Sequence, residues 1–563
     1  MAQPEVDAIR RQAEQARAAL LIASAASPGE GGPVEVADRV GRAVAEAEPE
    51  PVRQDWARRF TSALVSGRFW PSVPILSNAG RGEGGQLAAC FVLEPEDSLD
   101  SIYQTLARAA RIQQGSGGVG IDLSKLRPRG AAIRRSGGVS PGPVAFAELA
   151  AHSARVNALA GRREGAHLIV LSDTHPDVRA FVEAAREVEA LRGAGLAVAV
   201  HDALLDAARR DDRYPLRDPR GEAAGSVSAR ELLFAIATAI RDTGNPTLLF
   251  LDAIAAANPT PGLGAPHATN PCGEQPLLPG ESCVLGSLSL PAFADPEGQL
   301  DLEALAEAAR LAIRFLDDVL EVTVFPDPDC AAASRRTRKV GLGVMGFADL
   351  LLLRGEEYGS PRSEQTATQL MACIEREARA ASEALAKERG AFPAFRGPGT
   401  PRRNATLLAI APTGTLRLLE GCNGGLEPWL DPVLRVETGE GRRLRWVDRW
   451  LLDWLEARTG QPDEVLEVLE QGTAGSSRVD LAESDRALLR LAHEVSPEAQ
   501  LRLQACFQAH VDGGVSKTVH LPEAVQVGEI VSLIHRAREL GCKGVAFWRH
   551  VAGGPTPCVR CAL

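Results

Sequence analysis

The sequence predicts an α/β protein preceded by a small helical region. Short apolar runs of the length expected for buried strands occur at residues 168–171, 196–200 and 545–548. Stretches with helical apolar spacing alternate with these runs, at residues 98–113, 229–243 and 302–320. The alternation continues from residue 90 to about residue 550 without a convincing linker or an internal repeat, which is typical of α/β architecture.

Residues 1–85 are expected to form the helical region. Residues 34–47 and 53–65 both carry apolar side chains at helical spacing. The apolar residues 18–26 resemble a weak signal core, but acidic residues precede them, so a short amphipathic helix is the better interpretation. Farther along, residues 455–500 are charged and helical in pattern, as in an insertion or an outer pair of helices. The last thirteen residues, 551–563, are predicted to be a flexible tail.

Composition narrows the class of protein. With 563 residues, 45% hydrophobic and 24% charged, the chain has the composition of a soluble globular protein. Its net charge of −11 argues against general nucleic-acid affinity, and no apolar run is long enough to span a bilayer. Ten cysteines without regular spacing, and no export signal, indicate a reducing cytoplasm. Any disulfide is therefore expected to be catalytic, and no metal site is predicted.

The most informative segment is Asn270-Pro271-Cys272-Gly273-Glu274. In an extended loop, side chains two residues apart project to one side, so Asn270, Cys272 and Glu274 are expected to share a face. A thiol would then lie beside a carboxylate base and an amide. The alternative is a turn that holds a buried cysteine. Two further cysteines, Cys90 and Cys283, favour redox chemistry over hydrolysis.

Two glycine-containing motifs have alternative interpretations. Residues 115–120 contain G-x-G-x-x-G, but a helical stretch precedes them and no acidic residue follows at the required distance, so a dinucleotide site is rejected. Glycine there still permits close approach of the backbone to a ligand. The second motif, Pro412-Thr413-Gly414-Thr415, begins a helical run and is either a phosphate cradle or an ordinary helix cap.

Cys558 and Cys561 form a C-x-x-C pair in the predicted tail. The pair is either half of a zinc site completed by Cys542 and His550, or a dithiol that visits an internal disulfide. The dithiol is the more economical interpretation, since the zinc spacing is not a standard one. The remaining cysteines lie in apolar contexts and are predicted to fill the core: Cys330, Cys373, Cys422 and Cys506.

Together these motifs resemble the large catalytic subunit of ribonucleotide reductases, specifically the adenosylcobalamin-dependent class II group. The resemblance is collinear from about residue 35 to the end of the chain. Its segments include Asn78-Ala79-Gly80, Ala89–Leu93, Ser136–Val139, Gly142-Pro143-Val144, Asn270–Leu278, Glu281-Ser282-Cys283, Arg338–Gly346, Arg403–Thr406, Ala411–Thr415, Val515–Thr518 and Glu539–Gly544. Chance does not produce so many matches in order and spacing.

The resemblance implies a ten-stranded α/β barrel over residues 86–550, with a central finger loop that carries Cys272. In that family this cysteine becomes a thiyl radical and takes the 3′ hydrogen of the substrate ribose. Glu274 would be the general base, and Asn270 would orient the sugar. Cys90 and Cys283 would reduce the substrate and end as a disulfide. The tail pair, Cys558 and Cys561, would re-reduce that disulfide, and a thioredoxin-type partner would reset the tail.

The resemblance also implies the ligands. Ribonucleoside diphosphates are the expected substrates, held by Ala89, Gly118, Asn270, Pro271, Gly273, Pro412, Thr413, Gly414, Thr415 and Leu416. Deoxynucleoside triphosphates would act as effectors near Asp97 and residues 161–167. A homodimer is a candidate assembly. The alternatives are a non-catalytic nucleotide-binding paralogue and a radical enzyme that acts on another nucleotide.

Tyrosine content supports the cobalamin subclass. Relatives that receive their radical from a separate subunit relay it through paired tyrosines near the C-terminus, and this chain has no tyrosine after Tyr358. The glycyl-radical signature Arg-x-x-Gly-Tyr is also missing. The chain departs from the family pattern at Ile75, Ala88, Val284, Gly513-Gly514 and Phe547-Trp548, which bears on substrate affinity and effector response.

Overall fold

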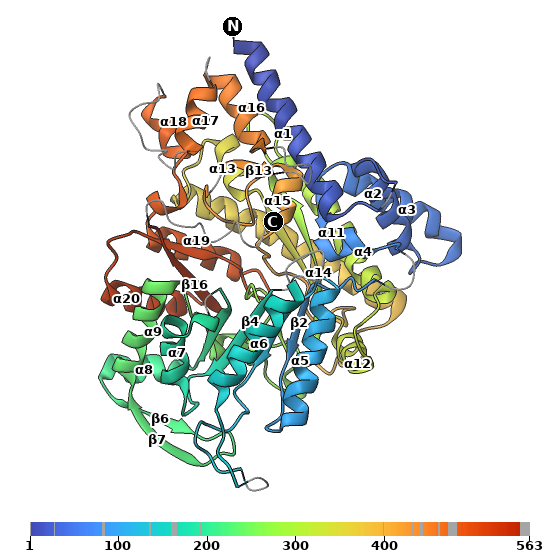
Figure 1. Ribbon diagram of the computed structural model, residues 1–563. Helices are drawn as coiled ribbons and strands as arrows, with labels where there is room; N and C mark the ends of the chain where they lie inside the picture. Colours follow the sequence, from blue (N-terminus) through green and yellow to red (C-terminus); the bar gives the residue numbers. More distant parts are fainter. Residues whose placement is uncertain are drawn as a thin grey trace.

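The computed structural model places most of the chain in one α/β assembly (Figure 1). The predicted tail with Cys558 and Cys561, together with Ser136 and residues 161–165, lies outside the described residues. The structure describes residues 2–27, 29–81, 85–133, 137–158, 166–191, 193–397, 399–430, 432–437, 443–459, 462–470 and 481–551.

A ten-stranded sheet forms the centre of the fold. One half consists of five mutually parallel strands: β2 (Cys90–Leu93), β3 (Gly118–Asp122), β4 (His167–Ser172), β5 (Gly195–Val200) and β8 (Thr247–Phe250). The other half includes two parallel pairs, β11 (Ser282–Ser289) with β12 (Val340–Met345), and β15 (Thr518–Leu521) with β16 (Gly544–Arg549). The halves meet antiparallel where β2 pairs with β11 and where β8 pairs with β16.

Residues 408–410 close the sheet on itself. Leu408 forms a parallel bridge with Leu342 of β12, and Ile410 forms one with Val515, just before β15. The predicted ten-stranded α/β barrel is therefore confirmed. The short strand β1 (Phe69–Pro71) is the tenth strand of the sheet and pairs antiparallel with β11, while residues 408–410 complete the ring of the barrel.

Side chains alternate between the inside and the outside of the barrel. On β4, Leu168 and Val170 belong to an inner cluster that includes Cys90 and Cys283, whereas Ile169 and Leu171 pack in the outer core. This period of two is what a strand covered on both faces requires. The outer core lies under the covering helices: α5 (Leu99–Gln114), α6 (Pro143–Ala158), α7 (Val178–Glu187), α8 (Asp202–Arg210), α9 (Ala229–Thr243), α11 (Leu302–Val322), α14 (Pro361–Arg389), α19 (Pro497–Gln508) and α20 (Val527–Glu539).

The N-terminal residues are helical, as predicted, in α1 (Ala2–Ser24), α2 (Pro33–Ala45) and α3 (Glu50–Val65). α1 packs on the hairpin of β13 (Val433–Glu437) and β14 (Arg443–Val447). Residues 455–500 contribute the end of α16 (Arg449–Arg458), then α17 (Pro462–Glu470) and α18 (Glu483–Leu488), as the charged helical pattern predicts. No helix among the described residues has both the length and the apolar composition of a membrane span.

A dinucleotide-binding turn in the glycine run at residues 115–120 is rejected from the sequence, and the structure agrees with that rejection. α5 precedes it and Gly115 caps that helix, and the run continues into β3 rather than into a helix. The four cysteines predicted to fill the core do so: Cys330, Cys373 and Cys422 are buried, and Cys506 packs against the core half-buried.

A two-stranded hairpin occupies the inside of the barrel. It consists of β9 (Ala268–Thr269) and β10 (Pro276–Leu277), and its tip is residues 270–275. Gly120 of β3 makes room for it, because a Cβ there would lie 1.9 Å from the Thr269 carbonyl oxygen. The predicted central finger loop is thus present. Direct contact between the backbone of the finger at Thr269 and the backbone of β3 at Gly120 holds it in place.

Gly120→Ala is expected to destabilise the fold by about 1–3 kcal/mol, because the added methyl group overpacks a site that has no free volume. Urea unfolding of the purified chain measures this change. Gly528→Ala is the matched control, since Gly528 is exposed in α20 with nothing near its Cβ position. That control should raise stability by about 0.5–1 kcal/mol, as alanine usually does in a helix. Equal effects of both variants would contradict the seating role of Gly120.

Candidate active site

The tip of the finger is a tight turn. Gly273 N–H donates to the Asn270 carbonyl at 3.1 Å, Asn270 N–H donates to the Gln275 carbonyl at 3.2 Å, and Gly273 has φ +84°. The expected extended loop is therefore wrong in its backbone geometry, because a positive φ at glycine reverses the chain within four residues. The expected convergence still occurs, since Asn270, Cys272 and Glu274 all line one pocket.

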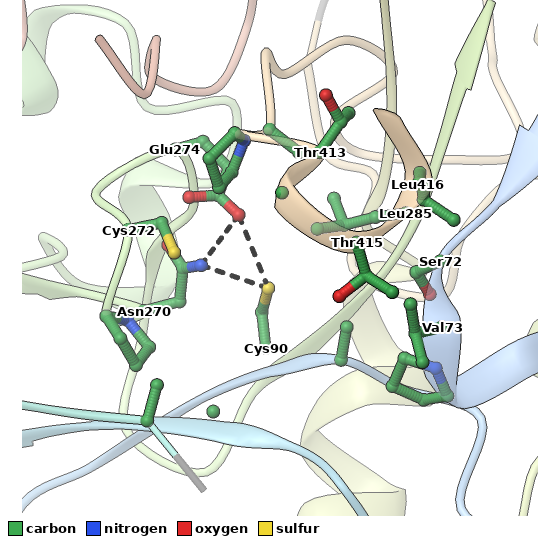
Figure 2. A pocket seen from close by; sticks show the side chains of 18 of the residues that line it. Ser72, Val73, Cys90, Asn270, Cys272, Glu274, Leu285, Thr413, Thr415 and Leu416 are labelled. Atoms are coloured by element: carbon green, nitrogen blue, oxygen red, sulfur yellow. Dashed lines mark hydrogen bonds between the residues drawn. The ribbon is translucent and has the colours of Figure 1, made fainter. Parts of the chain in front are cut away.

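Three side chains interlock at the base of this pocket (Figure 2). The Asn270 amide nitrogen lies 2.8 Å from Glu274 Oε1 and 3.1 Å from Cys90 Sγ, and Cys90 Sγ lies 3.7 Å from the same Glu274 oxygen. The side-chain oxygen of Asn270, Oδ1, accepts a hydrogen bond from Gln275 N–H at 3.0 Å. The amide orientation is therefore fixed by the backbone, and its N–H group is directed at the carboxyl and the thiol.

Among the described residues that line the pocket, Glu274 is the only one with a carboxyl group. It is 1% exposed, and its Oε2 atom has no hydrogen-bond partner among the described residues. Burial raises the pKa of the carboxyl to about 7, and the hydrogen bonds from Asn270 and Cys90 oppose that rise only in part. A carboxyl group with this pKa can exchange a proton near neutral pH, which is what a general acid or base requires.

Cys90 and Cys283 lie directly opposite each other on β2 and β11. Opposite residues on antiparallel strands have Cα atoms about 4.5–5.5 Å apart, which is within the range of about 4.4–6.8 Å that a disulfide bridges. Both are buried free thiols, and burial raises the pKa of each well above its usual value. Cys272 differs from both, because it is exposed.

A buried ion pair lies beside Cys283. Lys339 Nζ is 2.7 Å from Glu281 Oε2, and both side chains are at most 1% exposed. The carboxylate also accepts hydrogen bonds from Leu278 N–H and the Thr337 hydroxyl, both at 2.8 Å. The Lys339 charge acts to lower the pKa of the Cys283 thiol, although burial outweighs it.

The opposite wall of the pocket is the loop that begins α15 (Gly414–Glu420). Thr413 has φ +51°, and its hydroxyl accepts a hydrogen bond from Gly425 N–H at 2.8 Å instead of capping the helix. Thr413 therefore occupies the N-cap position of α15, as the interpretation as a helix cap predicts, but its side chain does not cap the helix. The loop places residues 412–416 along the pocket, which has about 750 Å³ of open space.

The pocket contains most of the residues expected to bind substrate. Gly273 and Cys283 do not line it, and Asp97 lies elsewhere, bonded to Arg127 at 2.7 Å. Sequence reasoning missed ten of the described lining residues, although the glycine run pointed to two of them, Ser116 and Gly117. The described residues that line the pocket are Ser72, Val73, Pro74, Ala89, Cys90, Ser116, Gly117, Gly118, Ala166, Asn270, Pro271, Cys272, Glu274, Leu285, Gly286, Ser287, Ala411, Pro412, Thr413, Gly414, Thr415 and Leu416.

Three of the departures from the family pattern are fully buried: Ile75, Ala88 and Val284. None of them lines the pocket, so these substitutions remove no side chain from its present wall. No lysine or arginine appears among the lining residues that the structure describes. An anionic ligand would therefore be held here by neutral N–H and O–H donors.

Comparisons with known proteins agree with this fold. The family model described as "Ribonucleotide reductase, barrel domain" matches residues 88–402 and 396–548, and the one described as "Ribonucleotide reductase, all-alpha domain" matches residues 22–84. The alpha subunit of the Actinobacillus ureae class Id ribonucleotide reductase has the same fold, with a TM-score of 0.80 and 22% identity over 96% of this chain and 98% of that one.

Two curated relatives are more similar in sequence. A protein of Mycobacterium tuberculosis strain CDC 1551, named vitamin B12-dependent ribonucleoside-diphosphate reductase, is 42% identical over 92% of this chain and 75% of its own length. A protein of Thermoplasma acidophilum with the same name is 36% identical over 88% of this chain and 65% of its own length. The chain belongs to the ribonucleotide reductase large-chain family.

Proposed function

We propose that this chain reduces ribonucleotides, specifically ribonucleoside diphosphates, to 2′-deoxyribonucleotides by thiyl-radical chemistry. One observation carries the proposal. A single pocket presents an exposed thiol (Cys272), a carboxyl that titrates near pH 7 (Glu274), and one member (Cys90) of a buried pair of thiols. Hydrolysis has no use for the buried pair, whereas replacing a carbon–oxygen bond by a carbon–hydrogen bond consumes two electrons, which two thiols can supply.

Each group has a defined part in the proposed reaction. Cys272, as a thiyl radical, takes the 3′ hydrogen atom of the ribose, while Glu274 accepts the 3′ hydroxyl proton. Asn270 holds both Glu274 and Cys90 in place through its amide nitrogen. One thiol of the Cys90–Cys283 pair protonates the 2′ hydroxyl, which leaves as water. The second thiol proton and the two electrons of the pair form the new C2′–H bond, and the two sulfur atoms form one disulfide. Glu274 returns its proton to the 3′ oxygen, and Cys272 returns the hydrogen atom to C3′.

Adenosylcobalamin is the proposed radical source, as the names of the two curated relatives indicate for those proteins. When bound, this group supplies the radical that oxidises a thiol. The donor set fits, because Cys272 is the exposed thiol of the pocket and Cys90 and Cys283 are buried, so a large group at the mouth would face Cys272 alone. Cys272 and the adjacent Pro271 are the residues expected to lie against it.

The remaining partners are also proposals. Asp97, held by Arg127, is the proposed anchor for deoxynucleoside triphosphate effectors, and the functional unit is proposed to be a homodimer. Cys558 and Cys561 are proposed to reduce the Cys90–Cys283 disulfide and to be reset by a thioredoxin-type protein. The eight cysteines of the described part are present as reduced thiols, which favours the reducing cytoplasm as the location.

Turnover with each ribonucleoside diphosphate and triphosphate tests the activity. The purified chain with adenosylcobalamin and dithiothreitol should form deoxynucleotides, with diphosphates preferred, and should need no iron-bearing subunit. Product analysis by chromatography measures this. Nucleotide binding without turnover would support the non-catalytic paralogue, and turnover only with a di-iron protein would contradict the cofactor assignment.

Serine substitutions separate the three thiols. Cys272→Ser should abolish both reduction and exchange of the 3′ hydrogen with solvent, because serine does not form the equivalent radical here. Cys90→Ser and Cys283→Ser should block product formation after 3′-hydrogen abstraction has begun. Release of tritium from 3′-labelled substrate measures the first step. Cys506→Ser, which removes a half-buried thiol outside the pocket, is the matched control, and equal mild losses in all four variants would refute the roles.

The pKa of Glu274 sets a pH dependence. Because the base form is the carboxylate and its pKa is raised to about 7, kcat should increase as pH rises from 6 to 8 and then level off. Glu274→Gln should lower kcat by about 10²–10⁴-fold and remove this limb of the profile. Glu297→Gln, at an exposed residue, is the control and should keep the rise of kcat between pH 6 and 8. An unchanged limb in Glu274→Gln would show that another group titrates.

The tail pair has a separate test. Replacing Cys558 and Cys561 with serine should leave single-turnover reduction intact, since Cys90 and Cys283 begin reduced. Thioredoxin-driven multiple turnover should stop, and dithiothreitol should partly restore it. The zinc alternative requires Cys542 as a ligand, and that thiol is buried in the core. Stoichiometric zinc in the purified chain, lost on replacing the pair, would end the dithiol proposal.

A further inference from the structure

One short segment, residues 511–516, joins the finger to the strand that leads into the opposite wall of the pocket. Gly514 N–H donates to the Glu274 carbonyl at 2.7 Å, on the finger side. On the other side, Gly513 N–H donates to the Leu408 carbonyl at 2.9 Å, and Ile410 N–H donates to the Gly514 carbonyl at 3.2 Å. Residues 408–410 continue directly into Ala411 and the loop at residues 412–416. The segment therefore contacts both halves of the site through backbone hydrogen bonds.

Glycine is required here for space rather than for backbone conformation. A Cβ on Gly514 would lie 2.5 Å from the Gly273 carbonyl oxygen, and one on Gly513 would lie 2.7 Å from the Glu274 carbonyl oxygen. Neither glycine has a positive φ. The finger and the 511–516 segment are therefore in direct backbone contact, so any displacement of the segment displaces Glu274.

Lys543 holds the outer side of this segment. Its ammonium nitrogen lies 3.1 Å from the Val511 carbonyl oxygen, 2.7 Å from that of Asp512 and 2.8 Å from that of Gly513. Three carbonyl groups thus converge on the three N–H donors of one ammonium group. Lys543 is 7% exposed, and its own carbonyl accepts from Phe250 N–H at 2.9 Å, which anchors its backbone to β8 of the barrel.

The same segment is tied to the strand of residues 407–410 through a side chain. Asp512 Oδ2 accepts hydrogen bonds from Leu407 N–H at 2.9 Å and from Leu408 N–H at 3.3 Å. The Asp512 carbonyl, in turn, is one of the three that Lys543 holds. The only other side chain that donates to these carbonyls in the described part is Gln508, to Val511 and Gly513.

We propose that Lys543 is a positioning residue for the reaction: by holding residues 511–513 it fixes the distance between Glu274 on the finger and the substrate-binding loop at residues 412–416. Lys543 touches neither the pocket nor a reacting atom. Without its ammonium group, three carbonyl groups in a buried site lose their main donor, and the segment moves to reach other donors. The functional part of this inference rests on the proposed reductase activity, whereas the structural part does not.

Hydrogen exchange on the chain alone, at pH 7, tests the structural part with Lys543→Met. Burial lowers the pKa of Lys543 to about 8, so the ammonium is the main form at that pH. Exchange should accelerate in peptides that cover residues 268–277, 405–416 and 511–516, and should stay unchanged in α11. Lys543→Gln keeps two N–H donors, so its hydrogen-exchange rate in these peptides should lie between those of the wild type and Lys543→Met. This variant replaces Lys543→Met in the test if the methionine variant does not fold.

Lys517→Met is the matched control, because Lys517 is also buried but binds Gln500 and Glu427, away from the finger. Lys517→Met should lower the Tm at least as much as Lys543→Met does. Hydrogen exchange of residues 268–277 should nevertheless stay at the wild-type rate. The proposal would be overturned if hydrogen exchange of residues 268–277 accelerated equally in both variants. It would also be overturned if exchange in Lys543→Met accelerated throughout the chain, or did not accelerate at all.

The functional part of the inference is tested by measuring kcat and KM separately in Lys543→Met. Misplacement of reacting groups by about 1 Å costs about 10²-fold in rate, so Lys543→Met should lower kcat by about that factor and change KM by less. Accelerated local exchange with an unchanged kcat would refute the positioning role while leaving the reductase proposal intact. An inactive wild-type chain with the same exchange pattern would refute the reductase proposal alone.

Discussion

The whole site depends on close contact between backbone segments inside the barrel. A barrel of this size is usually filled by side chains, but here a hairpin occupies the interior and brings Cys272 and Glu274 to its centre. Three glycines permit this, since a Cβ on Gly120, Gly513 or Gly514 would fall within 2.7 Å of a finger carbonyl oxygen. Strand geometry is rigid, so the barrel fixes the positions of the reacting groups.

Burial then divides the three thiols into two kinds. Cys272 is exposed to the pocket mouth, whereas Cys90 and Cys283 face each other across two strands and remain neutral because burial raises their pKa values. A neutral thiol is a poor nucleophile, and this protects the pair from unwanted exchange. The same burial raises the pKa of Glu274 to about 7, so one property of the interior prepares both the base and the reductant.

Local patterns predicted the elements well but not the site as a whole. The helix at residues 229–243 agrees with α9, and the apolar runs at 168–171 and 196–200 lie within β4 and β5, because periodicity is encoded locally. The turn at residues 270–273 was expected to be extended, since its shape comes from the glycine and from contacts that close only inside the barrel. Lining residues such as Ser72 and Ala166 have no local signal, because barrel closure alone brings them beside Cys272.

The composition of the pocket has a consequence for how substrate is held. Among the described residues that line it there is no lysine or arginine, and Glu274 is the only one with a carboxyl group. No charged side chain of this lining attracts the phosphate of the proposed nucleotide substrate, and its binding is proposed to depend on N–H and O–H donors such as those of residues 413–415. Such donors act over short distances and need accurate geometry. A site of this kind depends more on the rigidity of its supports than a charged one does, and the backbone junction of residues 511–516 provides that rigidity to both walls at once.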